Sequence, residues 1–240
     1  MPVEIANIDL VVFDKDGTLI DFHAMWSGWA EDLAGRLVAT TSEDVRGPVY
    51  AMLGYDPVAR MARPGGGLIS TPMARLHDMT VAAVIAAGVA PAVAQAAVEA
   101  AWHAPDPAGL AHPLTDLHGL LGRLRARGRR IAIATSDDRQ PTERTMKALD
   151  LGDLVDALVC ADDGVANKPA PDPVLHVCRV VGVEPARTAV VGDSPADMAM
   201  GRGAGAGLIV GVRTGVGTDA DLAAADVILD SVADLEAALG

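Results

Sequence analysis

The feature that most constrains the fold is a short apolar run, Leu10 to Phe13, which stops abruptly at two aspartates. Four apolar residues with β-branched side chains in the middle are typical of a strand buried on both faces of a sheet. Asp14 and Asp16 follow, and Gly17 then allows the backbone to turn tightly. Two carboxylates at the end of a buried strand are costly to desolvate. Either a bound cation compensates their charge, or one carboxyl group keeps its proton for acid–base chemistry.

Two other interpretations of this stretch are a plain turn and a calcium loop. Aspartate and glycine both favour turn geometry, so Asp14, Asp16 and Gly17 could occur together without any chemistry. A calcium loop of the helix–loop–helix type ends in a glutamate ligand, and Met25 stands at that position here. The choice between a turn and a reactive site therefore depends on what the rest of the chain brings to these aspartates.

The second half of the chain alternates between helical patterns and short apolar runs. This alternation is typical of a parallel sheet with helices on both faces. We expect strands at residues 131–134, 158–160, 189–191, 208–212 and 227–229, and helices at 114–127, 142–149, 173–181 and 195–204. Together with the first strand, these segments are expected to form one α/β core.

Residues 22–107 differ, because they show helical spacing but no convincing strand. Helices are expected at 23–38, 71–88 and 91–103, with a further helix starting near 42–44 and a loop at 60–70. A stretch rich in proline and glycine, 104–109, is a natural hinge. We therefore predict a discontinuous α/β core, residues 1–20 and 108–240, and an inserted helical domain, residues 21–107.

The net charge, the cysteines and the apolar segments limit the partners and the cellular location that we expect for this protein. The formal net charge is −13 and the pI about 4.7, so nucleic acid or an anionic membrane is not expected as a main partner. Cys160 and Cys178 lie on apolar patterns and are expected to be reduced core residues. Residues 79–98 carry no charge, but Gly88 and Pro91 interrupt them, which favours two buried helices over a membrane span. No signal-peptide pattern opens the chain, and we expect a cytoplasmic protein.

Reactive side chains follow four of the expected strands, at the ends where parallel sheets bind ligands. In chain order they are Asp14 and Asp16, then Thr135 and Ser136, then Lys168, and then Asp193 with Asp197 one helical turn later. Carboxylates suit a hard cation such as Mg²⁺, and a hydroxyl and a lysine can hold the oxygens of a phosphoryl group. These are the groups that phosphoryl transfer requires.

At these positions the sequence resembles the haloacid dehalogenase-like hydrolase superfamily, specifically its phosphoglycolate-phosphatase-like phosphatases. Four segments in the family's order carry the resemblance: Asp14-Lys15-Asp16-Gly17-Thr18-Leu19, Ala134-Thr135-Ser136, Lys168-Pro169-Ala170-Pro171-Asp172 and Gly192-Asp193-Ser194-Pro195-Ala196-Asp197. The resemblance implies a Rossmann-like, doubly wound parallel sheet in which the helical insert is a cap domain. It also implies a Mg²⁺-dependent phosphatase that acts on a small-molecule phosphate ester.

The resemblance further implies a role for each matching aspartate. Asp14 would be the nucleophile that forms an aspartyl-phosphate, since a carboxylate is already ionised at neutral pH. Asp16 would protonate the leaving oxygen and then activate the attacking water. Mg²⁺ would be held by the side chains of Asp14 and Asp193 and by the backbone carbonyl of Asp16.

The same resemblance assigns substrate binding to Thr135, Ser136 and Lys168. Thr135 would donate a hydrogen bond to a phosphoryl oxygen, and Lys168 would neutralise charge on the nucleophile and the phosphate. Two positions depart from the commoner pattern: Lys15 stands where an apolar residue is frequent, and Ser136 where asparagine often follows the threonine. Neither change removes a required group, so both bear on substrate preference and not on the chemistry.

Several other polar residues have structural interpretations. Asp172, just before Pro173, is expected to cap a helix. Asp197 could support Lys168 or the metal, or could only stabilise a helix N-terminus. Turn or cap positions are expected for Asp137, Asp138, Asp162 and Asp163. In the insert, packing is expected for Trp26 and Trp29, and either substrate contact or a solvated surface position for His23, Arg60 and Arg63.

Two other functions remain compatible with the motifs. A phosphomutase would use the same groups but return the phosphoryl group to a sugar instead of water. A binding protein that has lost catalysis is less favoured, because every reactive position is filled. Within the phosphatase interpretation, the substrate can be phosphoglycolate, a sugar phosphate or another small ester, and the sequence sets no oligomeric state.

Overall fold

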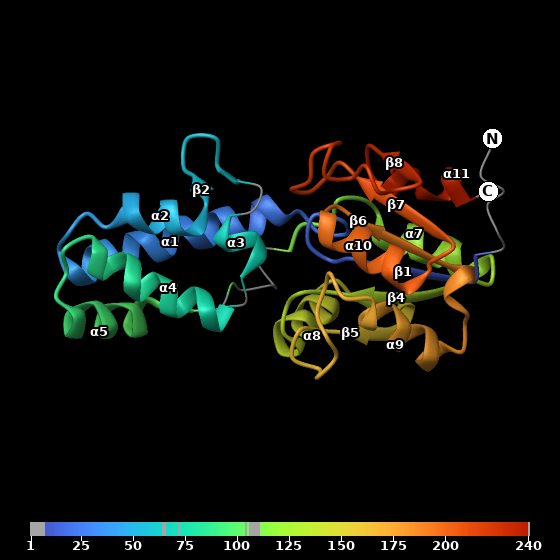
Figure 1. Cartoon of the computed structure of the whole chain (residues 1–240), viewed down its shortest axis with the longest axis horizontal. Helices are drawn as coiled ribbons and strands as arrows, with labels where there is room; N and C mark the ends of the chain where they lie inside the picture. Colours follow the sequence, from blue (N-terminus) through green and yellow to red (C-terminus); the bar gives the residue numbers. More distant parts are fainter. Residues whose placement is uncertain (1–7, 64–65, 72, 104, 106–110, 240) are drawn as a thin grey trace. The chain divides into compact units, whose positions relative to one another are not determined.

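The computed structural model describes residues 8–63, 66–71, 73–103, 105 and 111–239 (Figure 1). The chain divides into two compact units, one formed by Met1–Phe22 with Pro107–Gly240 and the other by His23–Asp106. The expected hinge at 104–109 lies, except for residue 105, outside the described residues. Within the described ranges, no helix combines the length and the apolar character needed to cross a membrane.

The larger unit is built on a sheet of six parallel strands in the order β5-β4-β1-β6-β7-β8. The strands are β1 (Leu10–Phe13), β4 (Arg130–Ala134), β5 (Ala157–Val159), β6 (Thr188–Gly192), β7 (Leu208–Val212) and β8 (Val227–Leu229). The chain adds β4 and β5 on one side of β1 and then returns to add the other three on the opposite side. The order therefore reverses at β1, and ligands of such sheets bind at the carboxyl ends beside that reversal. The prediction of a doubly wound α/β core is confirmed.

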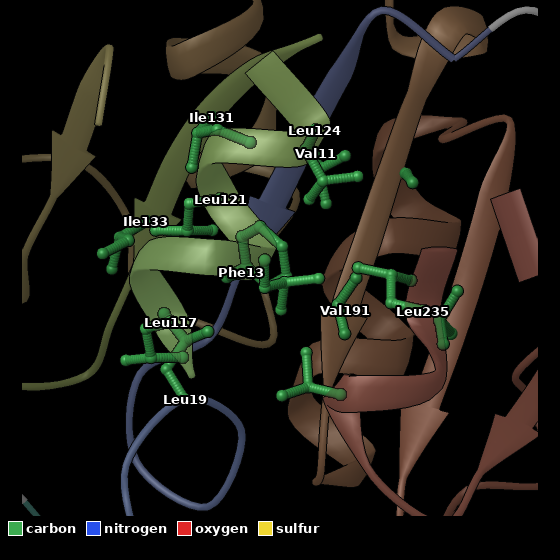
Figure 2. Packing of buried hydrophobic residues seen from close by; sticks show 14 of the residues in the cluster. Val11, Phe13, Leu19, Leu117, Leu121, Leu124, Ile131, Ile133, Val191 and Leu235 are labelled. Atoms are coloured by element: carbon green, nitrogen blue, oxygen red, sulfur yellow. The ribbon is translucent and has the colours of Figure 1, made fainter. Parts of the chain in front are cut away.

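Helices cover both faces of the sheet (Figure 1). They are α7 (Leu117–Ala126), α8 (Arg139–Ala148), α9 (Asp172–Val181), α10 (Pro195–Ala204) and α11 (Leu235–Leu239). Because side chains alternate along a strand, Val11 and Phe13 pack with α7 and α11 on one face, as Figure 2 shows. Leu10 and Val12 pack with α9 and α10 on the other face. All four side chains are fully buried, which fixes β1 in the centre of the core.

Three helices of this unit begin at residues other than those predicted. The helix expected from residue 142 begins three residues earlier, at Arg139. The helix expected from residue 114 begins at Leu117, because the Asp116 carboxylate caps it by accepting a hydrogen bond from the Gly119 N–H at 2.9 Å. The prediction that Asp172 caps a helix is wrong. Asp172 is already the first residue of α9, and Pro171 precedes it with a backbone near the helical region. The Asp172 carboxylate thus lies in the first turn, where the helix dipole favours a negative charge.

The second unit is mainly helical. Its helices are α1 (Phe22–Thr41), α2 (Arg46–Leu53), α3 (Gly67–Ser70), α4 (Met73–Ala86) and α5 (Pro91–Ala101). The uncharged stretch at 79–98 is divided between α4 and α5, and Gly88 between them takes a φ of +98°. Trp29, buried in α1, packs edge-on against Trp26 and donates from Nε1 to the His103 carbonyl at 2.7 Å. The expected packing of the two tryptophans is therefore observed.

The expectation that this unit has no strand is wrong in one place. β2 (Tyr55–Asp56) and β3 (Met61–Ala62) form a short antiparallel hairpin. The Asp56 carboxylate accepts hydrogen bonds from the N–H groups of Val58 and Ala59, which builds the turn. The helix expected near 42–44 begins instead at Arg46. This start places Pro48 in the first turn, where its missing N–H costs no helical hydrogen bond.

Asp156 is expected to make a pH-dependent contribution to stability. It accepts hydrogen bonds from Arg125 at 2.9 Å, Arg130 at 2.9 Å and the Ile131 N–H at 2.8 Å. Burial works to raise the pKa of Asp156, but these donors outweigh it, so the pKa is lowered. We expect Asp156→Asn to reduce the free energy of unfolding by about 1–3 kcal/mol at pH 7.

The sign of the pH effect follows from the lowered pKa. The contribution of Asp156 is complete above the unfolded aspartate pKa of about 3.9 and is lost as the pH falls through the folded value. Urea unfolding from pH 7 to pH 3 should show the difference between wild type and variant shrinking in acid. Asp153→Asn, at an exposed aspartate nearby, is the control. A difference that stays constant down to pH 3 would contradict the assignment.

Candidate active site

The carboxyl ends of β1 and β6 bring three aspartates together. Asp14 directly follows β1, and Asp193 and Asp197 follow β6. One carboxylate oxygen from each lies within 4.8 Å of the others, and all three residues are buried. The strands adjoin each other, and the Asp14 N–H continues their ladder by donating to the Val191 carbonyl at 2.8 Å. The sheet topology therefore places Asp14 and Asp193 side by side, although 178 residues separate them in the sequence.

Lys168 lies within this cluster. Its Nζ donates to Asp14 Oδ1 at 2.5 Å and to Asp197 Oδ1 at 2.6 Å, and its side chain is 5% exposed. Burial alone would lower the pKa of Lys168, but the charges of Asp14 and Asp197 outweigh it and raise the pKa. Lys168 is therefore a fixed cation beside the Asp14 carboxylate.

Asp197 has both of the structural roles that the sequence leaves open. Its Oδ1 accepts from Lys168, and its Oδ2 accepts from the Ser194 N–H at 3.1 Å and the Ser194 hydroxyl at 2.6 Å. These contacts form a capping box at the start of α10. Asp197 therefore supports Lys168 through one oxygen and the start of α10 through the other.

The electrostatics of the cluster fit a divalent cation. Burial raises the pKa of Asp14 to about 6, against the opposing effect of Lys168. Burial, together with the charges of Asp14 and Asp197, raises the pKa of Asp193 well above its ordinary value. One ammonium group cannot balance three carboxylates, and a bound cation would relieve the remaining repulsion. The donors are oxygens, the ligands that Mg²⁺ prefers.

A loop after β7 closes tightly around Asp193. The Val216 N–H donates to Asp193 Oδ2 at 2.8 Å, and the Thr214 hydroxyl donates to the Gly17 carbonyl at 2.7 Å. A Cβ at Gly215 would collide with the Asp193 side chain, so only glycine fits there without a shift of its neighbours. Thr214, Gly215 and Val216 were not predicted from the sequence. The glycines at 211, 215 and 217 were the available signal, but they follow no recognised motif.

Gly215→Ala is expected to weaken metal binding more than it weakens the fold. The added methyl group would displace the Asp193 carboxylate or the 214–217 loop. We expect the Mg²⁺ concentration for half-maximal activity to rise about 10-fold or more, the size of effect seen when supports of metal ligands are lost. Activity and thermal unfolding would be measured as functions of Mg²⁺. Gly152→Ala is the control, since a Cβ there meets nothing within 4 Å. An unchanged Mg²⁺ dependence in Gly215→Ala would refute this prediction.

Asp16 lies outside the three-aspartate cluster and has its own partner. Lys15 Nζ contacts Asp16 Oδ1 at 2.6 Å and Oδ2 at 2.5 Å. Burial raises the pKa of Asp16 to about 7, with Lys15 opposing the shift. A carboxyl group with a pKa near neutrality can both give and take a proton at physiological pH.

The two candidate phosphate-binding residues after β4 differ in exposure. Thr135 is buried, and its Oγ1 accepts from the Asp137 N–H at 3.1 Å, which leaves the hydroxyl proton able to donate. Ser136 is exposed. In the helical unit, Arg60 pairs with Glu31 at 3.0 Å and Arg63 with Asp56 at 3.1 Å, and both arginines are exposed.

Two of the aspartates expected in turns have structural roles. Asp163 accepts from Arg139 and from the Cys160 N–H, and Asp162 accepts from the Arg139 N–H. These bonds order the connection between β5 and Lys168. Asp137 is different, because its carboxylate pairs with Lys15 Nζ at 3.0 Å.

Residues 8–205 match the family model for haloacid dehalogenase-like hydrolases, and the chain belongs to this family. A phosphoglycolate phosphatase from Rhodospirillum rubrum is 32% identical over 200 residues, which are 83% of this chain and 78% of that protein. The predicted enzyme class, a phosphatase of the haloacid dehalogenase type, is confirmed.

Solved structures agree on the fold. A predicted phosphoglycolate phosphatase from Haemophilus somnus 129pt matches with a TM-score of 0.70 and 18% identity over 98% of this chain and 99% of that chain. A protein from Thermotoga maritima, provisionally assigned as a beta-phosphoglucomutase, matches with a TM-score of 0.68 and 18% identity over 97% and 98%. Identities this low show the shared fold alone, so the fold does not separate a phosphatase from a phosphomutase.

Proposed function

We propose that this protein is a Mg²⁺-dependent phosphatase that hydrolyses a small phosphomonoester through an aspartyl-phosphate on Asp14. The observation that carries the proposal is the buried cluster of Asp14, Asp193 and Asp197 around Lys168 at the ends of β1 and β6. A carboxylate held beside a fixed ammonium group and a cation site is suited to attack a phosphorus atom. The relative in Rhodospirillum rubrum makes phosphoglycolate the first substrate to test.

In the first step, an Asp14 oxygen attacks phosphorus, and the bond from phosphorus to the ester oxygen breaks. Asp16 gives its proton to that leaving oxygen, so the alcohol departs neutral. Lys168 already contacts Asp14 Oδ1 at 2.5 Å, where it reduces the repulsion between the carboxylate and the phosphoryl oxygens. The Thr135 hydroxyl donates to one of those oxygens and orients the group.

In the second step, water attacks the phosphorus of the aspartyl-phosphate. Asp16, now ionised, takes a proton from this water, and the bond between phosphorus and the Asp14 oxygen breaks. Asp14 returns as a carboxylate, and inorganic phosphate leaves. The pKa of Asp16, raised by burial to about 7, suits both halves of this cycle.

The metal would be held by carboxylate oxygens of Asp14 and Asp193 together with the backbone carbonyl of Asp16. A bound Mg²⁺ supplies positive charge against the phosphoryl oxygens. The protein prepares this position through Val216, whose N–H orients Asp193, and through Lys168, which orients Asp14.

A panel of phosphate esters, assayed for inorganic phosphate with Mg²⁺ present, tests the proposal. Phosphoglycolate, sugar phosphates and p-nitrophenyl phosphate should be included. One phosphate released for each ester consumed supports a phosphatase, whereas isomerised sugar phosphate without phosphate release would identify a phosphomutase. Binding without turnover of any ester would favour the non-catalytic alternative and refute the proposal.

Removal of the metal is expected to abolish turnover. The cluster offers carboxylate oxygens and carries excess negative charge, so Mg²⁺ should restore activity after chelation and Zn²⁺ should not. Ca²⁺ should substitute poorly, because it prefers more ligands at longer distances. The measurement is phosphate release after EDTA treatment and readdition of each ion. Full activity in EDTA would rule out the metal requirement.

A further inference from the structure

The side chain of Lys15 is buried between two carboxylates. The side chain is 1% exposed. In the sequence, Lys15 stands between Asp14, the proposed nucleophile, and Asp16, the proposed acid–base residue. Its Nζ contacts both oxygens of Asp16, at 2.6 and 2.5 Å, and Asp137 Oδ2 at 3.0 Å. Burying an ammonium group is costly unless it is paired, and here the pairing comes from two separate loops.

The arrangement repeats the pattern around Asp14. Asp14 shares Lys168 with Asp197, and Asp16 shares Lys15 with Asp137. In each case a buried lysine joins a reacting aspartate to a second carboxylate that fixes the lysine. Asp14 and Asp16, the two aspartates that react in the proposed mechanism, therefore each have a lysine and a second carboxylate that anchors it.

Lys15 is not arranged to bind the substrate directly. An ammonium group has three N–H donors, and the Asp16 and Asp137 carboxylates lie within bonding distance of Nζ. Its burial also removes it from solvent, from which a phosphate ester must enter. Any effect of Lys15 on the reaction must therefore pass through Asp16 or Asp137.

We propose that Lys15 is a positioning residue that holds the Asp16 carboxyl group in place for proton transfer, with Asp137 as its anchor. This inference rests on the proposed function. A carboxylate oxygen has two lone pairs, so each Asp16 oxygen that accepts from Lys15 keeps one for the proton it exchanges. Asp137 also donates its backbone N–H to the Thr135 hydroxyl. The anchor thus joins the phosphate-binding loop to the loop that carries Asp14 and Asp16.

The first test is Lys15→Met, which keeps most of the apolar stem and removes the cation. Two matched esters, phenyl phosphate and p-nitrophenyl phosphate, differ mainly in how much their leaving group needs a proton. A shift of a catalytic group by about 1 Å can lower the rate about 100-fold. We expect single-turnover formation of phosphoenzyme from phenyl phosphate to fall about 10- to 100-fold. With p-nitrophenyl phosphate it should fall only about 2- to 3-fold, and KM should change little for both esters.

The second test is Asp137→Asn, which keeps Lys15 and weakens its anchor. It should show the same selective loss for phenyl phosphate, at about 3- to 10-fold, and the double variant should lose no more than Lys15→Met alone. Asp163→Asn is the matched control, because its carboxylate pairs with Arg139 and not with Lys15. That control should affect both esters equally, if it affects either.

Three outcomes would overturn the inference. First, if the rate falls equally for both esters and KM rises, Lys15 acts as a charge that attracts the phosphate. Second, if Lys15→Met and Asp137→Asn both keep the wild-type kinetics, Lys15 has no role in the reaction. The third outcome is structural and independent of turnover: crystal structures of wild type and Lys15→Met with the Asp16 carboxyl group in the same place. If wild type hydrolyses no ester but Asp16 moves in Lys15→Met, the proposed function fails, whereas Lys15 is still shown to hold the Asp16 carboxyl group in place.

Discussion

Replacing Asp14 with asparagine is expected to abolish both phosphate release and formation of a phosphoenzyme. The amide is close in size to the carboxylate, but it lacks the charge and the nucleophilicity of an ionised oxygen. It also weakens the contact with Lys168 Nζ, which lies 2.5 Å from Asp14 Oδ1 in the native protein. Loss of a nucleophile commonly costs about 10⁴-fold or more, so residual turnover should lie near the assay limit.

The measurement combines a phosphate assay with mass spectrometry after acid quench. Wild type should carry one phosphoryl group on the peptide containing Asp14, and the variant should carry none. Asp163→Asn provides a comparison in which an aspartate of the same unit is neutralised outside the cluster. Phosphoryl label on Thr135 or Ser136 would show that the nucleophile has been misassigned.

Replacing Asp16 with asparagine should separate the two halves of the reaction. General acid–base catalysis contributes about 10²- to 10⁴-fold in rate, so steady-state turnover should fall by that amount. In the first step, formation of the aspartyl-phosphate, the loss of rate should depend on the leaving group. p-Nitrophenolate departs readily without a proton, whereas phenolate needs one. Hydrolysis of the aspartyl-phosphate requires a base with either ester, so this second step becomes slow for both.

Phosphoenzyme should therefore accumulate in Asp16→Asn with p-nitrophenyl phosphate. A burst of p-nitrophenol close to one equivalent, followed by slow turnover, is the kinetic sign. The increase in mass on the Asp14 peptide is the chemical sign. With phenyl phosphate the burst itself should be slow. Turnover at the wild-type rate with both esters would remove Asp16 from the acid–base role.

Much of the fold could be read from local patterns. The strand at Leu10–Phe13 and the helix at Pro195–Ala204 lie where the sequence predicts them, because an apolar run and a Ser-Pro start with a capping aspartate act over a few residues. Local signals also led to a wrong prediction at the start of α9. Asp172 is followed by proline and was expected to be a cap, but the preceding Pro171 already has a backbone that allows the helix to start one residue earlier.

The candidate site was predictable to the extent that its residues follow strands. A parallel sheet brings the carboxyl ends of its strands to one edge, so Asp14 and Asp193 were expected near each other, and the order β4-β1-β6 places them there. The roles of these residues, and of Asp16, Thr135, Ser136 and Lys168, remain predictions for the experiments above.

The order of residues along the chain already reveals which carboxylates, hydroxyls and lysines follow which strands, and hence the chemistry available. How these side chains pair depends on the folded structure. From the sequence, Lys15 departs from the commoner pattern in a way that bears on substrate preference, yet in the structure its Nζ pairs with the Asp137 carboxylate. Gly215 lies against Asp193, a contact that the sequence does not predict. Lys15 and Asp137, for example, lie more than a hundred residues apart in the sequence. Their distances depend on strand order, register and loop path, which no local pattern encodes.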